Sequence, residues 1–354
     1  MKIMSNESVL GKHFFYVAQT EEGYRQGCAE SPDGFMEDIS NAKIAWLDCI
    51  VNEINKDIYL IAEKFGFSKN LICALLTDYP SAYADFDTEM GLKVPAIMVT
   101  GLEVTLNPAI ILIRGNIILT IHGSNVVRFL RFRRYADVYL RKIPRKNPLN
   151  DKLTLLMARL LDENNSSNFD HLREIEQQGD TISKWMMDPK TPRSTLGPEI
   201  YKMKHALITY LNGLWATLDV ISSLRYGDAE LISDDEKILR RIDLLSNDVN
   251  RQIGLSEHMS EVLASGLEVL QSMYNNQLQV LNNRMAFAIT YLTILGTAVL
   301  VPNTIATVMS NTAFNMKPDD AGGYLALIIG STVIAIVIAY VGIIRMGWMP
   351  KNVD

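Results

Sequence analysis

Two long uncharged segments near the C-terminal end dominate the pattern of polar and apolar residues. Arg284 and Lys317 are separated by 32 residues without charge, and Asp320 and Arg345 by 24 more. A helix rises about 1.5 Å per residue, so about 20 apolar residues cross a hydrocarbon core about 30 Å thick. Two such segments rarely coexist in a soluble domain. The pattern predicts transmembrane helices over residues 285–311 and 323–345, joined by an outer loop over residues 312–322.

The segment before the first span has the pattern of one long amphipathic helix. Residues 234–284 contain no proline and only two glycines, Gly254 and Gly266. Apolar residues recur on one helical face, at Ile253, Met259, Val262, Leu263, Leu267, Leu270, Met273 and Leu278. Because nothing ends the helix before the membrane, we predict a stalk helix that continues into the first span. A helix of this length needs partners, and copies of the same chain are the simplest ones.

The N-terminal third has a mixed pattern that predicts an α/β domain over residues 1–122. We expect a helix over residues 52–65 and a hairpin turn at Gly115-Asn116. Strands are predicted over residues 43–51, 94–105, 110–114 and 117–122. From about Ser124 the pattern is helical, with breaks at residues 164–168 and 189–198. We therefore predict a helical region over residues 123–284 that ends in the stalk.

The charges beside the spans predict their orientation. Arg284 precedes the first span, and Arg345 and Lys351 follow the second, whereas Lys317 in the loop is offset by two aspartates. The positive-inside rule places both termini, including the tail over residues 346–354, in the cytoplasm. The N-terminal segment lacks the apolar core of a signal peptide, and the three cysteines have no paired spacing. We expect a multi-pass protein of the cell membrane with reduced thiols.

Composition excludes several functions. Lys and Arg number 34 against 40 Asp and Glu, a net charge of −6, and a dedicated nucleic-acid binder normally has a basic surplus. No HExxH, GxSxG, GxGxxG or phosphate-binding GxxxxGK[ST] motif is present, so we predict neither an enzyme nor a resident cofactor. The membrane potential remains as an energy source, worth about 4.6 kcal/mol per 100 mV for a divalent cation.

Hydroxyl groups form a stripe along the first span. Thr290, Thr293, Thr297, Thr304, Thr307 and Asn311 follow one another at intervals of 3, 4, 7, 3 and 4, with Leu300 at the missing heptad position. One interpretation is that these hydroxyls bond back to their own helix or join neighbouring helices. The other is a pore wall formed by symmetry-related copies, with Leu300 or Val301 as an apolar gate. We predict the pore wall.

Two charged groups in the helical region have alternative interpretations. Glu257, His258 and Glu261 fall within about one turn of the stalk and could hold a metal ion between subunits, although an ordinary charged surface is simpler. A basic run could bind anions or lipid headgroups, but pairing with the many acids is the simpler interpretation. The run comprises Arg128, Arg131, Arg133, Arg134, Arg141, Lys142, Arg145 and Lys146.

Three segments and one proline carry a resemblance to a known family. They are residues 281–294 (LNNRMAFAITYLTI), residues 66–77 (GFSKNLICALLT), residues 116–122 (NIILTIH) and Pro302. Together with the order of the parts, they make the whole chain resemble the CorA family of divalent-cation channels. The resemblance implies an α+β membrane protein with an N-terminal cytoplasmic αβα domain, a long stalk helix and two C-terminal spans. It also implies a homopentameric funnel in the lipid bilayer that conducts divalent cations, Mg²⁺ by default and Co²⁺ or Ni²⁺ as further candidates.

The outer mouth departs from the family pattern. Where the family has Tyr-Gly-Met-Asn-Phe, this chain has Ser310-Asn311-Thr312-Ala313-Phe314 when it is placed by Pro302 and Phe314. An alternative register reads Met309-Ser310-Asn311 and keeps an asparagine with one residue shifted. The resemblance assigns Ser310, Asn311 and Thr312 to the selectivity ring. Mg²⁺ sheds water reluctantly, so a ring of Asn311 amides would hold the hydrated ion through its waters. Asp319 and Asp320 would form an electrostatic ring that concentrates cations.

A second departure concerns regulation. The family's inhibitory Mg²⁺ site between subunits uses acids at positions where this chain has Cys73-Ala74 and Asn250–Gln252. Because hard cations need oxygen ligands, closure by cytoplasmic Mg²⁺ through that site is not expected. Two other functions stay open at this point. One is membership of the zinc-transporting branch with coupling to protons, and the other is a membrane-anchored sensor or scaffold that conducts nothing.

Overall fold

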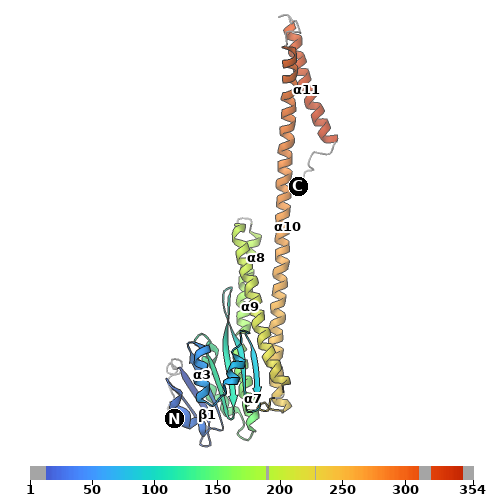
Figure 1. Ribbon diagram of the computed structural model, residues 1–354. Helices are drawn as coiled ribbons and strands as arrows, with labels where there is room; N and C mark the ends of the chain where they lie inside the picture. The colour runs from blue at the N-terminus through green and yellow to red at the C-terminus, as the bar shows by residue number, and fades with distance from the viewer. Residues whose placement is uncertain (1–12, 189–190, 228, 311–319, 346–354) are drawn as a thin grey trace. The chain divides into compact units, whose positions relative to one another are not determined.

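The computed structural model describes residues 13–188, 191–227, 229–310 and 320–345 of the chain (Figure 1). Contacts within the chain divide it into two units, Met1–Gly266 and Leu267–Asp354. The first unit contains every described strand, and the second contains the C-terminal part of the longest helix together with the last helix. The second unit contains both apolar segments and also the last part of the predicted stalk, residues 267–284.

A seven-stranded sheet forms the centre of the first unit. Its order is β2-β1-β3-β7-β6-β5-β4, with β3 and β7 parallel and the other neighbours antiparallel. The strands are β1 (Phe14–Gln19), β2 (Tyr24–Ala29), β3 (Ile44–Val51), β4 (Ala82–Phe86), β5 (Glu89–Thr100), β6 (Glu103–Arg114) and β7 (Ile117–Gly123).

Along the chain, helices lie between the strands and after the last of them. The helices between the strands are η1 (Pro32–Phe35), α2 (Met36–Ser40), α3 (Ile54–Lys64) and α4 (Lys69–Leu75). After the sheet come α5 (Val127–Arg133), α6 (Ala136–Lys142), α7 (Leu149–Asn165), α8 (Asn168–Met187), α9 (Arg193–Tyr226), α10 (Glu236–Met309) and α11 (Ala321–Arg345).

Both faces of the sheet are covered, which explains the unbroken apolar run of β3. Side chains alternate between faces along a strand. Leu47 and Cys49 of β3 belong to the core formed with α3 and α4. Trp46 points to the other face, where its ring lies 4.8 Å from that of Phe132 in α5. The domain therefore has the three αβα layers that the sequence predicts.

Two predicted boundaries are wrong. The strand expected over residues 94–105 is two strands, because β5 ends at Thr100 and β6 begins at Glu103. Gly101 makes the turn with a φ of +64°, a conformation that costs glycine little. The expected break over residues 189–198 is also too long, since α9 begins at Arg193 and includes Pro198.

The predicted stalk and first span are confirmed as one helix. α10 runs from Glu236 to Met309 through Pro302, and its most apolar window has none of its residues buried within the chain. In the most apolar window of α11, 6% of the residues are buried within the chain. Core helices of soluble proteins are mostly buried, so exposed helices of this length and hydropathy indicate membrane spans.

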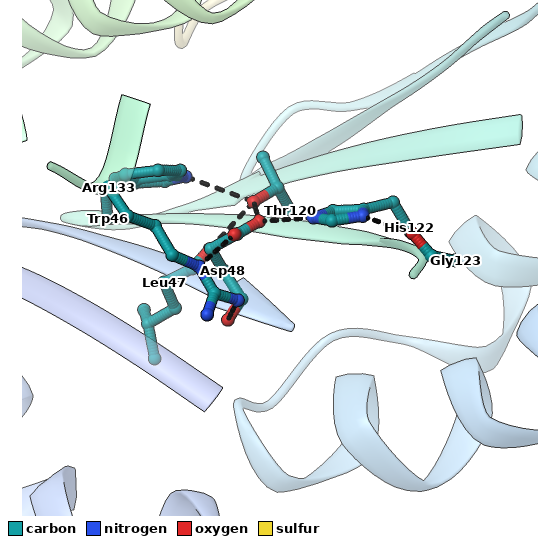
Figure 2. Close-up of polar contacts among 7 residues, drawn as sticks. All are labelled: Trp46, Leu47, Asp48, Thr120, His122, Gly123 and Arg133. Carbon is teal, nitrogen blue, oxygen red and sulfur yellow. Dashed lines mark hydrogen bonds and ion pairs between the residues drawn. The ribbon is translucent and has the colours of Figure 1, made fainter. Parts of the chain in front are cut away.

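A buried polar cluster joins β3, β7 and α5 (Figure 2). The Asp48 carboxylate is fully buried and accepts from Arg133 Nε at 2.6 Å and from the Thr120 hydroxyl. His122 places Nε2 3.0 Å from Asp48 Oδ1 and Nδ1 2.8 Å from the carbonyl oxygen of Gly123. Both ring nitrogens of His122 therefore lie within hydrogen-bonding distance of an oxygen atom.

The charges around Asp48 decide its ionisation. Burial by itself would raise the pKa of Asp48, but the charges of His122 and Arg133 and the hydrogen bonds from His122 and Thr120 hold that pKa well below its usual range. The folded protein therefore keeps Asp48 ionised. A carboxylate whose pKa is lower in the folded chain stabilises the fold above the unfolded pKa, and this contribution is lost as the pH falls.

We predict that Asp48→Asn lowers the free energy of unfolding by about 3 kcal/mol, because it leaves a buried cation without its counterion. The free energy of unfolding of the wild type should also fall as the pH drops below 3.8, the ordinary pKa of an aspartate carboxyl. The free energy of unfolding of the variant should depend less on pH in this range. Urea unfolding of the full chain followed by tryptophan fluorescence measures both. Asp137→Asn is the control, because it breaks a surface pair with Arg141 worth about 0.5 kcal/mol or less. Equal stability of the two variants would contradict this account.

Candidate functional site

The threonine face of α10 has a regular hydrogen-bonding pattern. Each hydroxyl donates to the carbonyl four residues earlier, at 2.7–2.9 Å. The pairs are Thr290 with Ala286, Thr293 with Ile289, Thr297 with Thr293, Thr304 with Leu300 and Thr307 with Asn303. A hydroxyl has one hydrogen and two acceptor sites. With the hydrogen used by the helix, each oxygen presents acceptor sites to whatever lies against this face.

The same face is uncovered within one chain. Thr293, Thr304 and Thr307 are exposed and Thr290 and Thr297 are half-buried. Leu300 is 63% exposed and Val301 is half-buried. The predicted pore and gate residues thus share an unpacked helix surface, and their role in a pore stays a prediction.

The predicted outer-mouth residues lie within or next to residues 311–319, which the structure does not describe. Asn311, Thr312 and Asp319 lie outside the described residues. Ser310 is exposed and its hydroxyl donates to the Thr307 carbonyl at 2.9 Å, and Asp320 is exposed just before α11. The Tyr324 hydroxyl donates to the Ala306 carbonyl at 3.2 Å, so α11 and α10 are joined close to this mouth.

The predicted intersubunit metal group does not form a site within one chain. Across the described ranges, no cluster of three or more His, Cys, Asp or Glu is placed to hold a metal ion. His258 instead lines a cavity of about 190 Å³ between α8, α9 and α10, together with Glu176 and Asp180. A role of Glu257, His258 and Glu261 in metal binding would need ligands from another copy.

Gln252 lies in the segment, Asn250–Gln252, near which the resemblance places a regulatory acid, and it has a structural role here. It is 1% exposed, and its Oε1 accepts from Asn168 Nδ2 at 3.2 Å. Asn168 Oδ1 in turn accepts from Arg128 at 2.9 Å, and Arg128 also donates to the Ile97 carbonyl at 2.7 Å. This chain of contacts joins α10 to α8, α5 and β5. The neighbouring Asn250 is exposed, as are Cys73 and Ala74.

Sequence reasoning did not identify Asn168 and Gln252 as partners. The asparagines at residues 164–168 indicated only a break between helices, and an amide at Gln252 looked like a missing acid. Two members of the basic run do pair with acids, as the simpler interpretation predicts, because Arg133 pairs with Asp48 and Arg141 with Asp137. Arg128 differs because it donates to the amide oxygen of Asn168 and to the carbonyl oxygen of Ile97. Burial lowers the pKa of Arg128 to about 10.

Comparison with known proteins agrees with this geometry. Among solved structures, the chain is similar to the complete CorA magnesium transporter of Methanocaldococcus jannaschii, with 18% identity, a TM-score of 0.67, and coverage of 95% of this chain and 98% of that one. It is also similar to the ZntB cytoplasmic domain of Vibrio parahaemolyticus, with 15% identity, a TM-score of 0.55, and coverage of 75% and 99%. Full-length CmaX matches at 14% identity and a TM-score of 0.50, over 95% and 97% of the two chains. No curated protein matches the sequence significantly.

An α/β domain joined by one unbroken helix to a pair of spans defines an integral membrane protein with a large domain outside the bilayer. The sequence matches the family described as CorA-like Mg²⁺ transporter protein over residues 41–345. The chain belongs to the CorA-like Mg²⁺ transporter family. Members of this family are described as transporters.

The contacts of Gln252 generate a prediction about the stalk. Gln252→Ala removes one of two acceptors of the buried Asn168 amide, the other being Asn165 Oδ1 at 3.3 Å. One buried amide hydrogen is then left unpaired, which costs about 1–3 kcal/mol. We expect faster amide hydrogen exchange over residues 245–256 while the sheet stays protected. Asn250→Ala is the matched control, because that amide is exposed and donates to Ser246 Oγ at 3.4 Å. Similar exchange in both variants would show that the buried contact does not hold the helix.

Proposed function

We propose that the chain forms a homopentameric channel that conducts divalent cations, Mg²⁺ by default, into the cytoplasm. Both termini lie in the cytoplasm, and Co²⁺ and Ni²⁺ are further candidate ions. The threonine face of α10 is the observation that supports this function, together with membership of the family. In a ring of copies, that face lines the central path.

The chemistry of a hydrated cation suits these hydroxyls. Mg²⁺ keeps most of its waters, and the hydrogens of those waters point away from the ion. A wall for such an ion must therefore accept hydrogen bonds. Thr293, Thr304 and Thr307 have already donated their hydroxyl hydrogens to the helix, so their oxygens face the path as acceptors.

Leu300 and Val301 form the gate in this proposal. They interrupt the hydroxyl face with apolar side chains, and rings of apolar side chains close pores by excluding water. When the ring narrows, a hydrated ion loses its hydrogen-bonding wall at this level. Widening restores a continuous column of water.

The outer mouth selects and concentrates the ion. Amide and hydroxyl oxygens of Ser310, Asn311 and Thr312 contact the hydrated ion through its waters. Asp319 and Asp320, repeated around the ring, attract cations from outside. A divalent cation entering a cell with a negative interior gains about 4.6 kcal/mol per 100 mV, so neither a nucleotide nor a cofactor is needed.

Zn²⁺ transport coupled to protons is the second candidate function. The similarity to the ZntB cytoplasmic domain supports it. Cys73-Ala74 and Asn250–Gln252 supply no carboxylate at the family's regulatory positions, so Mg²⁺ closure through them is not part of either candidate. Liposomes containing a Zn²⁺ dye and a pH dye separate the two functions, because only the second acidifies the lumen during Zn²⁺ entry.

We predict that Thr297→Leu reduces Mg²⁺ influx about tenfold, because it extends the apolar gate along the path and disfavours water there. The measurement is dye-reported influx into liposomes under an imposed negative potential. Thr332→Leu is the matched control, since Thr332 in α11 makes the same bond to the carbonyl four residues earlier, at 2.7 Å.

Unchanged influx in Thr297→Leu would show that this face does not line the path. Absence of Mg²⁺ and Zn²⁺ entry through intact wild-type pentamers would reject conduction and leave a sensor or scaffold role.

A further inference from the structure

Two arginines of the basic run lie against a tyrosine of the sheet. Tyr24 in the edge strand β2 is half-buried. The guanidinium carbons of Arg141 and Arg145 lie 5.6 and 5.5 Å from the centre of its ring. Cation–π attraction holds arginines at such distances without neutralising them. The ring therefore orients two guanidinium groups while their positive charge stays available.

A buried lysine belongs to the same group. Lys152, the fourth residue of α7, is 5% exposed, and its Nζ donates to the Arg145 carbonyl at 2.9 Å. Burial lowers the pKa of Lys152, and the nearby positive charge of Lys43 lowers it further. Lysines this deeply buried are normally paired with an acid. Within the ranges that the structure describes, neither Lys152 nor Arg145 forms an ion pair with a carboxylate.

The charges of this group do not balance. Lys43 pairs with Glu21 at 3.6 Å, and Arg141 pairs with Asp137 at 2.9 Å. The other two cations keep their charge without a described acid, which leaves an excess of two positive charges. A buried ammonium group without a counterion is costly. A dianion beside Lys152 and Arg145 would balance the group.

We propose that Lys152, Arg145 and Arg141 bind the phosphate group of a phosphate monoester. Such a group carries a charge of about −1.5 to −2 at pH 7 and three acceptor oxygens. Guanidinium forks match pairs of phosphate oxygens, and an ammonium group adds a point charge. α7 also begins without a side-chain capping bond, and the N-terminal end of a helix favours negative charge. This site in the α/β domain and its neighbouring helices does not depend on conduction by α10.

A buried amide beside Tyr24 indicates which monoester fits. Gln19 is 1% exposed, and its Nε2 donates to the Tyr24 hydroxyl at 2.9 Å. Its Oε1 is buried and accepts no hydrogen bond from any described residue. An amide oxygen can accept from a hydroxyl group, which a sugar phosphate or a nucleotide carries beside its phosphate. Phosphatidic acid offers the same phosphate, but both remaining hydroxyls of its glycerol are esterified. We therefore expect a soluble nucleotide or sugar phosphate.

Two matched ligands test recognition of the phosphate. AMP and adenosine differ only in the phosphate group, so AMP should bind the full chain in detergent at least about tenfold more tightly than adenosine. AMP binding should weaken between about pH 7 and about pH 5, because the second phosphate pKa is about 6. Inorganic phosphate should displace AMP. Isothermal titration calorimetry measures all three effects, and none of them requires ion flux.

Variants locate the site. Lys152→Met and Arg145→Gln should each weaken AMP binding about tenfold, because each removes one charged donor to phosphate. Lys202→Met is the matched control, since Lys202 is exposed and pairs with Glu199 in α9. Arg145 is exposed, so Arg145→Gln should keep the wild-type fold even if the buried substitution does not.

A second ligand identifies the source of the phosphate. Dihexanoyl phosphatidic acid, titrated below its micelle concentration, presents a lipid headgroup without a membrane. Binding of this lipid that requires Arg145, without binding of AMP, would support the phosphate site and assign it to lipid headgroups. Equal binding of AMP and adenosine, unchanged AMP affinity in Arg145→Gln, equal weakening in Lys202→Met, or binding of neither AMP nor the lipid would overturn the proposal.

Discussion

α10 is one helix from Glu236 to Met309, with its backbone hydrogen bonding interrupted at Pro302, and the function proposed for the protein depends on this continuity. A helix satisfies its backbone polar groups internally, so it can pass from water into lipid without exposing them. The same helix is fixed at one end by buried contacts such as Gln252 with Asn168. Its other end carries the threonine surface that we propose contacts the transported ion, so one element joins the α/β domain to the proposed path.

The threonine face shows that two interpretations of a polar stripe need not exclude each other. Hydroxyls that bond back to their own helix satisfy their hydrogens in an apolar surrounding, which makes them tolerable within a membrane. The same bonds orient the oxygens and leave them as acceptors. In the described part of the span, Leu300 is the residue that interrupts this series.

Features encoded locally could be predicted from the sequence, and features that depend on distant contacts could not. The spans, the stalk and the hairpin at Gly115-Asn116 follow from periodicity and turn residues. The turn at Gly101 was hidden because apolar residues continue on both sides of it. Asp48 is separated from His122 and Arg133 by more than 70 residues, and Gln252 from Asn168 by 84. No local pattern identifies such partners, and the roles proposed for Asn311 and Asp319 would depend on an assembly of several chains.

Pro302 gives α10 an uneven stiffness. Proline has no amide hydrogen, so the carbonyl of Ala298 receives no bond from the residue four positions later. Bends in helices concentrate where that ladder is interrupted. The interruption spans Leu300 and Val301, so bending α10 costs least at the level where the apolar side chains lie. A force applied to the helix from the α/β domain would therefore be converted into angular displacement there, while the remaining turns move as a rigid rod.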